Sequence, residues 1–305
     1  MASGPKLEWS RDGRGIVSCI AGMVRLHDAT GGVVRELAGA RVLDVRWRED
    51  GRILALDNRG TLTWRAAGVL VDQHNITFLD RRPHTASIAG DGRRFVAVSD
   101  REVFVASIGG ERVWTLDAQQ HDIAIDFQTS AILAGDGARV AIGYGRRERG
   151  RWSRDDGRGW VVIELATQEA LDRAWTTVAR APGYLQLAFD RHGKRLLHAA
   201  PEAGEQVGVI RLGRGEPFLP TCLAGSRAAA LDDNGVIAAY GYAGGAPLRV
   251  DYLSPERRGP AQIEVLDTLR LDPGLPDLLA LAFSADSHGL ACLAADGSIE
   301  VVPVP

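Results

Sequence analysis

The sequence predicts an all-β fold built from seven copies of one short unit. The first observation is a tight turn, usually Asp-Gly, that recurs along all 305 residues. Counted on the second turn residue, successive copies are separated by 38, 41, 45, 56, 42 and 52 residues. A period near forty residues with several strands per unit is typical of a β-propeller. We therefore predict one seven-bladed β-propeller domain over residues 1–305, with turns at Asp12-Gly13, Asp50-Gly51, Asp91-Gly92, Asp136-Gly137, His192-Gly193, Asn234-Gly235 and Asp286-Ser287.

Two apolar columns precede every turn and predict the first strand of each unit. Apolar residues at every second position are what a half-buried strand requires. Four positions before the second turn residue stand Trp9, Trp47, Ile88, Leu133, Phe189, Leu231 and Phe283. Two positions earlier stand Leu7, Val45, Ala86, Ala131, Leu187, Ala229 and Leu281.

The clearest copy of the unit runs from Val42 to Trp64 and predicts three strands. Asp50-Gly51 supplies a hairpin turn, because glycine tolerates positive φ and aspartate binds its own backbone. Ile53 to Leu56 forms the second strand, and Thr61 to Trp64 forms a third whose β-branched and aromatic residues suit a sheet. Three strands with one apolar face each cannot bury that face alone, so the unit needs neighbouring copies.

Later strands of the other copies follow the same order. Third strands are expected at Met23 to His27, Val103 to Ala106, Trp160 to Leu165, Val207 to Leu212, Leu248 to Leu253 and Ile299 to Val302. Fourth strands are expected at Val33 to Leu37, Val69 to Asp72, Val113 to Leu116 and Ile263 to Leu266. Glu169 to Val178 has helical propensity, but its place in the repeat favours strand and turn.

The last unit stops at its third strand, so we predict a final blade of three full strands. Pro303 and Pro305 then lie on its exposed edge, where a missing amide donor is harmless and discourages edge-to-edge pairing.

Two stretches carry a resemblance to the WD-repeat family. VRLHDATGGVVREL, Val24 to Leu37, resembles the end of a WD repeat, with His27-Asp28 in place of Trp-Asp. LAFSADSHGLACLAADGSIEVV, Leu281 to Val302, resembles the remainder of the repeat. The family's Gly-His and Trp-Asp dipeptides are missing from all copies, so its buried Asp-His-Ser-Trp network is not expected. The resemblance implies a propeller held by strand pairing and by apolar packing between sheets.

The composition narrows the classes of function. A net charge of -3 predicts solubility and argues against a surface that binds nucleic acid globally. Lys6 and Lys194 are the only lysines, so 36 minus 2 leaves 34 arginines, a bias typical of a GC-rich genome. Cys19, Cys222 and Cys292 are far apart among apolar neighbours and predict buried reduced thiols. With no apolar leader and no run that could cross a bilayer, a cytoplasmic protein without a membrane partner is expected.

Candidate partner-binding residues lie in the long connections between strands. The resemblance places the Asp-Gly turns on one face and the loops between second and third strands, with the connections between blades, on the other. The largest loop, Gly145 to Gly159, has a local charge of +3, and arginines beside a tryptophan can grip an anion or a base. A solvated hairpin in an arginine-rich protein explains the same residues. With the connections Gln73 to Thr85 and Ala118 to Ser130, the predicted set is Arg146, Arg147, Arg149, Arg151, Trp152, Arg154, His74, Arg81, Arg82 and His121.

No pattern of residues identifies a reaction. Seven histidines are scattered without metal-ligand spacing, and no phosphate-loop lysine is present. His121 and Asp122 are adjacent, but no nucleophile stands at a recognisable turn to form a catalytic site with them. We therefore predict no catalytic residues, no metal ligands and no cofactor.

These observations favour a non-catalytic scaffold for a protein or peptide partner, as a subunit of a larger assembly, with no obligate homo-oligomer. Because propellers host many functions, two alternatives stay open. One is a metal-dependent hydrolase of the lactonase or sugar-processing kind, with carboxylates gathered around the central channel. The other is a nucleic-acid-associated subunit that uses the arginine-rich loop.

Overall fold

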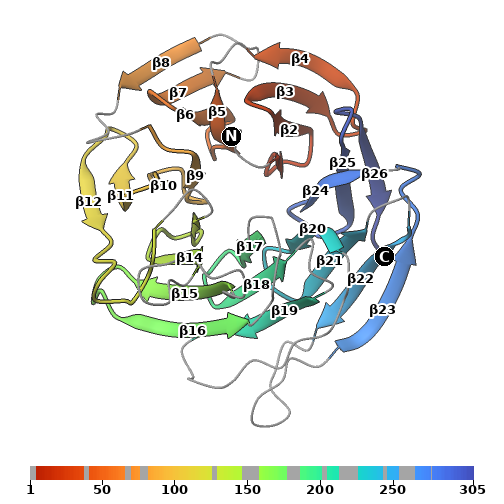
Figure 1. The fold of residues 1–305 in the computed structure, drawn as a ribbon. Coiled ribbons are helices and arrows are strands. Elements are labelled where there is room, and N and C mark those ends of the chain that lie inside the picture. The colour runs from red at the N-terminus through yellow and green to blue at the C-terminus, as the bar shows by residue number, and fades with distance from the viewer. Residues whose placement is uncertain are drawn as a thin grey trace.

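A computed structural model describes most of the chain (Figure 1). The described residues are 5–37, 41–65, 70–75, 82–125, 129–145, 158–176, 186–200, 205–212, 226–242, 246–253, 265–275 and 277–305. All regular elements in these ranges are β-strands, which form seven antiparallel sheets around a central space. The chain is therefore a seven-bladed β-propeller, as predicted.

Each blade is one continuous segment of the chain, with strands paired in sequence order. The first blade contains β1 (Lys6–Trp9), β2 (Gly15–Ile20), β3 (Met23–Asp28) and β4 (Val33–Leu37). The second contains β5 (Val42–Trp47), β6 (Arg52–Asp57), β7 (Gly60–Arg65) and β8 (Leu70–Asn75). The third contains β9 (Thr85–Ile88), β10 (Arg94–Val98), β11 (Val103–Ser107) and β12 (Arg112–Thr115). The fourth contains β13 (Ser130–Leu133), β14 (Arg139–Gly145), β15 (Arg158–Glu164) and β16 (Ala170–Thr176).

The remaining blades follow the same plan, with three described strands in the fifth and seventh and four in the sixth. The fifth contains β17 (Gln186–Phe189), β18 (Arg195–Ala200) and β19 (Glu205–Arg211). The sixth contains β20 (Ser226–Leu231), β21 (Ile237–Tyr242), β22 (Leu248–Leu253) and β23 (Val265–Leu271). The seventh contains β24 (Leu278–Phe283), β25 (Gly289–Ala294) and β26 (Ile299–Pro303).

The repeated turn is the feature that the sequence predicted best. Its second residue has positive φ in all seven copies, between 61° and 72°. The last copy adopts this conformation with Ser287, although residues other than glycine rarely do so. The strand β16 confirms strand rather than helix after Glu169. The fourth strand of the sixth blade, expected at Ile263 to Leu266, instead runs from Val265 to Leu271.

The hydrophobic core lies between blades, with one cluster at each of the seven junctions. Strand β10 shows how one strand serves two clusters. Phe95 and Ala97 pack toward the second blade, whereas Val96 and Val98 pack toward the fourth. Side chains of a strand alternate between its two faces, so a strand such as β10, whose successive residues are all apolar, packs against both neighbouring blades.

The ring closes by packing between the first and last blades, which lie side by side in Figure 1. The indole Nε1 of Trp9 donates a hydrogen bond to the carbonyl oxygen of Ala282, at 3.1 Å. Trp9 also joins an apolar cluster with Ile16, Leu293 and Ile299. In the described chain, strands of these two blades pair only within their own sheet.

Among the described residues the last blade has three strands, as predicted. The amide of Val304 donates to the carbonyl oxygen of His288 at 2.8 Å, so alternate residues Val302 and Val304 face β25. The backbone of Val301 and Pro303 consequently faces outward. Because Pro303 has no N–H, the edge loses a donor where an added strand would need one.

Two of the three cysteines are free, buried thiols, as predicted. Burial raises the pKa of Cys19 to about 11 and that of Cys292 to about 12. Cys222 lies outside the described residues. Nothing in the described ranges forms a helix with the length and hydropathy needed to span a bilayer.

Candidate functional site

Most of the predicted partner-binding residues lie outside the described part of the chain. These are Arg81, Arg146, Arg147, Arg149, Arg151, Trp152 and Arg154. His74 belongs to the fourth strand β8, where it pairs with Thr61, rather than to the connection that follows. The side chain of His74 is not among the described parts of the structure.

Arg82 and His121 are the predicted residues with described side chains. Arg82 is exposed in the connection between the second and third blades. His121 is only 5% exposed, in the connection between the third and fourth blades. Burial, and then the charge of Arg173, lower the pKa of His121, so the imidazole is neutral at physiological pH. Only Arg82 of this pair therefore offers a side chain to a partner.

The two faces of the propeller differ in the length of their connections. The face that carries the seven repeated turns is called the turn face here, and the opposite one the loop face. Strand ends at the loop face are joined by the long connections 76–84, 116–129, 146–157 and 177–185. At the turn face, residues 254–264 form a long connection, and a second one, 212–225, starts at the turn-face end of β19 and leads to the loop-face start of β20. The other connections at the turn face are short.

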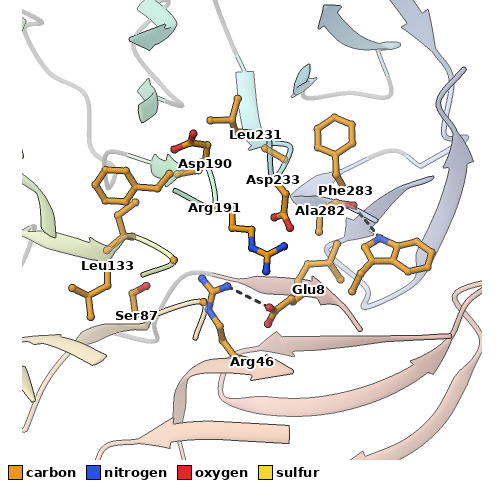
Figure 2. A pocket seen from close by; sticks show the side chains of 18 of the residues that line it. Glu8, Arg46, Ser87, Leu133, Asp190, Arg191, Leu231, Asp233, Ala282 and Phe283 are labelled. Atoms are coloured by element: carbon orange, nitrogen blue, oxygen red, sulfur yellow. Dashed lines mark hydrogen bonds and ion pairs between the residues drawn. The ribbon is translucent and has the colours of Figure 1, made fainter. Parts of the chain in front are cut away.

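A cavity of about 470 Å³ occupies the centre of the ring and reaches the turn face. Its wall is formed by the first strands of the blades and by the residues just after them (Figure 2). This volume is within the range of small-molecule sites. None of the candidate residues that were predicted from the sequence and are described in the structure lines this cavity.

One wall of the cavity is charged and comes from β1 and β5. Arg46 donates from Nε to the carbonyl oxygen of Ile88 at 2.7 Å and lies 3.3 Å from Glu8. The amide of Ile88 donates to Asp44 at 2.6 Å, and Lys6 lies 3.5 Å from the same carboxylate. Side chains of the second blade thus bind backbone groups on the inner edge of the third.

Glu8 is the most perturbed acid of this wall. Its side chain is 26% exposed, and it lines the central cavity. Burial raises the pKa of Glu8 to about 7, against the opposing charge of Arg46. Burial lowers the pKa of Arg46, but Glu8, Asp44 and Asp233 together outweigh it and raise that pKa above its ordinary value. Asp233 therefore acts on Arg46 from the sixth blade.

The remaining wall is mainly apolar. Leu133, Phe189, Leu231 and Phe283 line it, one from each of the fourth to seventh blades. Charged residues also line this side, among them Asp190, Arg191 and Asp233. Figure 2 shows the guanidinium of Arg191 pointing toward Arg46 and Glu8. The cavity therefore combines one charged wall with one apolar wall.

A serine–histidine pair elsewhere has a structural role. Ser18 Oγ lies 2.8 Å from Nε2 of His27, and Nδ1 of His27 lies 3.1 Å from the carbonyl oxygen of Gly31. Both side chains are buried, at 1% and 3% exposed, so no substrate reaches the hydroxyl. His27 lies at the position where the resemblance places the tryptophan of a WD repeat, and its contacts with Ser18 and Gly31 hold β2, β3 and the following turn together.

No three His, Cys, Asp or Glu side chains in the described ranges lie together as metal ligands would. The hydrolase alternative therefore has no described ligand set. The arginine-rich loop required by the nucleic-acid alternative lies outside those ranges.

The charged cavity residues escaped sequence reasoning, although the aligned repeat contained a signal. Two positions before each turn glycine or its equivalent, the copies carry Arg11, Glu49, Gly90, Gly135, Arg191, Asp233 and Ala285. All seven line the cavity. Comparing the seven copies position by position would have identified these residues as a set.

Comparison with known proteins yields the fold. No protein-family model matches the chain, and no curated protein matches it in sequence. Among solved structures, the Cps50 (Swd1) β-propeller domain of Myceliophteria thermophila is 14% identical, with a TM-score of 0.64 and coverage of 100% of this chain and 98% of that one. Kuenenia stuttgartiensis hydrazine synthase is also 14% identical, with a TM-score of 0.65 and coverage of 99% and 96%. At this identity the likeness concerns the fold alone, and it confirms the predicted WD-repeat-like seven-bladed β-propeller.

Proposed function

We propose that this propeller is a non-catalytic scaffold that binds a protein or peptide partner through its loop face. The observation that carries the proposal is the asymmetry of the two faces. Most of the long connections join strand ends at the loop face, and the strands themselves are fixed by seven apolar junctions. Loops on a rigid scaffold are where binding usually occurs. The partner surface then includes Arg82 and the arginines between residues 146 and 154.

Two buried carboxylates of the turn face support the same proposal, because their contacts are structural. Asp190 accepts N–H bonds from Lys194 and Arg195 within its own turn. Asp232 does the same for Val236 and Ile237. Carboxylates engaged by backbone amides hold turns in shape rather than moving protons in a reaction.

The test is affinity purification of the full chain, with light scattering to measure the mass of the complex. We expect a stoichiometric protein partner in a cytoplasmic extract. Replacing Arg146, Arg147, Arg149 and Arg151 by Ala should remove that partner, because these arginines supply the charged part of the loop face. Arg14→Ala is the matched control, since the Arg14 side chain is 88% exposed on the turn face.

The outcome also separates the alternatives. A partner retained by the quadruple variant would contradict the proposed surface. Recovery of nucleic acid in place of protein, lost steeply as salt increases, would favour the nucleic-acid alternative.

A further inference from the structure

The central cavity contains two opposite charges that are not paired with each other. Arg191 follows β17 in the fifth blade, and Asp233 occupies the same position in the sixth. Their backbones are joined, since the amide of Arg191 donates to the carbonyl oxygen of Asp233 at 3.0 Å. Yet in the described chain neither side chain forms a hydrogen bond or an ion pair. The charge of Asp233 acts on Arg46 through space, but neither side chain is bound, so both are available to a ligand.

Most other charges on the cavity wall have partners. Glu8 pairs with Arg46, Asp44 with Lys6, and Glu49 with Arg11. Three aspartates accept N–H groups of their own turns, namely Asp91, Asp136 and Asp190. Arg191 and Asp233 are distinguished from these groups by having no such contact.

The surroundings define the rest of the ligand. Phe189 and Leu231 come from the same two blades as the unpaired charges, and Leu133 and Phe283 extend this apolar wall on either side. Pockets of this kind bind a ligand mainly by apolar contact and orient it with a few polar groups. A ligand that satisfies the site carries both charges at one end and an apolar group at the other.

We propose that the cavity binds a small zwitterion with an apolar side chain, namely a free apolar amino acid. Arg191 binds the carboxylate, as guanidinium groups do in a forked geometry. Asp233 binds the ammonium group. The apolar wall receives the side chain, and a volume of about 470 Å³ is sufficient for it. This site is separate from the proposed loop-face partner surface.

Isothermal titration calorimetry on the full chain at pH 7.5 tests the proposal with four probes. Leucine carries both charges and a side chain, N-acetyl-leucine only the negative charge, leucinamide only the positive charge, and glycine no side chain. We expect leucine to bind, and each other probe to bind at least about tenfold more weakly. Capped probes that bind as tightly as leucine would overturn the zwitterion assignment, and no leucine binding up to about 10 mM would overturn the site.

Two variants locate the binding. Arg191→Gln and Asp233→Asn remove the unpaired charges from exposed turn positions, and each should weaken leucine binding about tenfold. Arg14→Gln and Asp12→Asn are matched controls, because both residues are exposed outside the cavity on the same face. Unchanged binding in the first two variants, with unchanged thermal unfolding, would contradict the site. These assays contain no partner, so their failure leaves the scaffold proposal intact.

Discussion

The guanidinium of Arg139 in the fourth blade donates a hydrogen bond from Nη1 to the carbonyl oxygen of Gly193 in the fifth, at 2.5 Å. Its Nε donates to Glu164 of its own blade at 2.9 Å, which fixes the direction of the side chain. The arginine stands two residues after its own turn glycine, and its acceptor is the turn glycine of the next blade. The same contact recurs on either side, as Arg94 to Gly137 at 3.3 Å and Arg195 to Gly235 at 2.5 Å.

Removing this contact should destabilise the ring. Arg139→Gln cannot reach the carbonyl of Gly193, and hydrogen bonds to charged groups contribute about 1.5–3 kcal/mol. We expect a loss of about 2 kcal/mol in the free energy of unfolding, measured with urea. Arg93→Gln is the control, because this exposed arginine makes no such inter-blade contact in the described chain, and it should change stability by less than about 0.5 kcal/mol. Equal losses in both variants would contradict the role of Arg139.

Gly31 tests how the ring closes. Its φ is +94°, and a Cβ built there would lie 2.4 Å from the carbonyl oxygen of Ile299 in the last blade. Gly31→Ala should therefore force the first and last blades apart. Gly13 in the same blade has φ +68° but open space around a Cβ, so Gly13→Ala reports the backbone strain alone, about 1 kcal/mol. Urea unfolding should show a loss at Gly31 larger by at least about 2 kcal/mol, and equal losses would refute the tight junction.

Ser287 tests a turn that lacks glycine. Its φ of 63° is strained for serine, but its hydroxyl donates to Asp232 of the sixth blade at 3.1 Å. Ser287→Ala keeps the strain and loses the bond, so a loss of about 1 kcal/mol is expected. Ser287→Gly loses the bond and relieves the strain, so it should be nearly neutral. Thermal unfolding of the pair checks the order, and an alanine variant as stable as glycine would contradict the account.

His198 should make the protein sensitive to acid. The imidazole is 1% exposed, and burial lowers its pKa to about 4 from an ordinary value of 6.5. The unfolded chain therefore takes up a proton first as pH falls. Stability from the neutral ring is fully present above pH 6.5 and is lost progressively down to pH 4, by about 3 kcal/mol.

The ring centroids of His198 and Trp160 are 5.9 Å apart. His198→Phe keeps an aromatic ring beside Trp160 but cannot titrate. Its unfolding free energy should therefore fall less between pH 7 and pH 4 than that of the unmodified protein, by about 3 kcal/mol. A difference in unfolding free energy between the two proteins that is the same at every pH does not affect this comparison. Parallel pH profiles would show that His198 does not contribute.

The strands were predictable because their signal is local. Phe95 to Val98 is a continuous apolar run, as expected of a strand that is buried on both faces. The positive φ of the turns was predictable for the same reason, since Asp-Gly specifies it. The strand expected at Ile263 to Leu266 overlaps the start of β23, which continues to Leu271.

The cavity could not be predicted by local reasoning. Glu8 accepts the amide hydrogen of Trp47, 39 residues later, at 3.1 Å, and pairs with Arg46. Such contacts depend on how one blade faces the next, which period-two patterning does not specify. The acidity of Glu8 depends in turn on burial at the centre of the ring, a property of the assembled fold.

Hydrogen exchange on the purified complex tests the central claim most directly, because it identifies the face that the partner covers. The account predicts slower exchange at the loop face, above all in residues 76–84, 116–129 and 146–157, and no change at the seven turns. Protection at the turns around Gly51, Gly137 and Gly235, with the loop face unchanged, would contradict it.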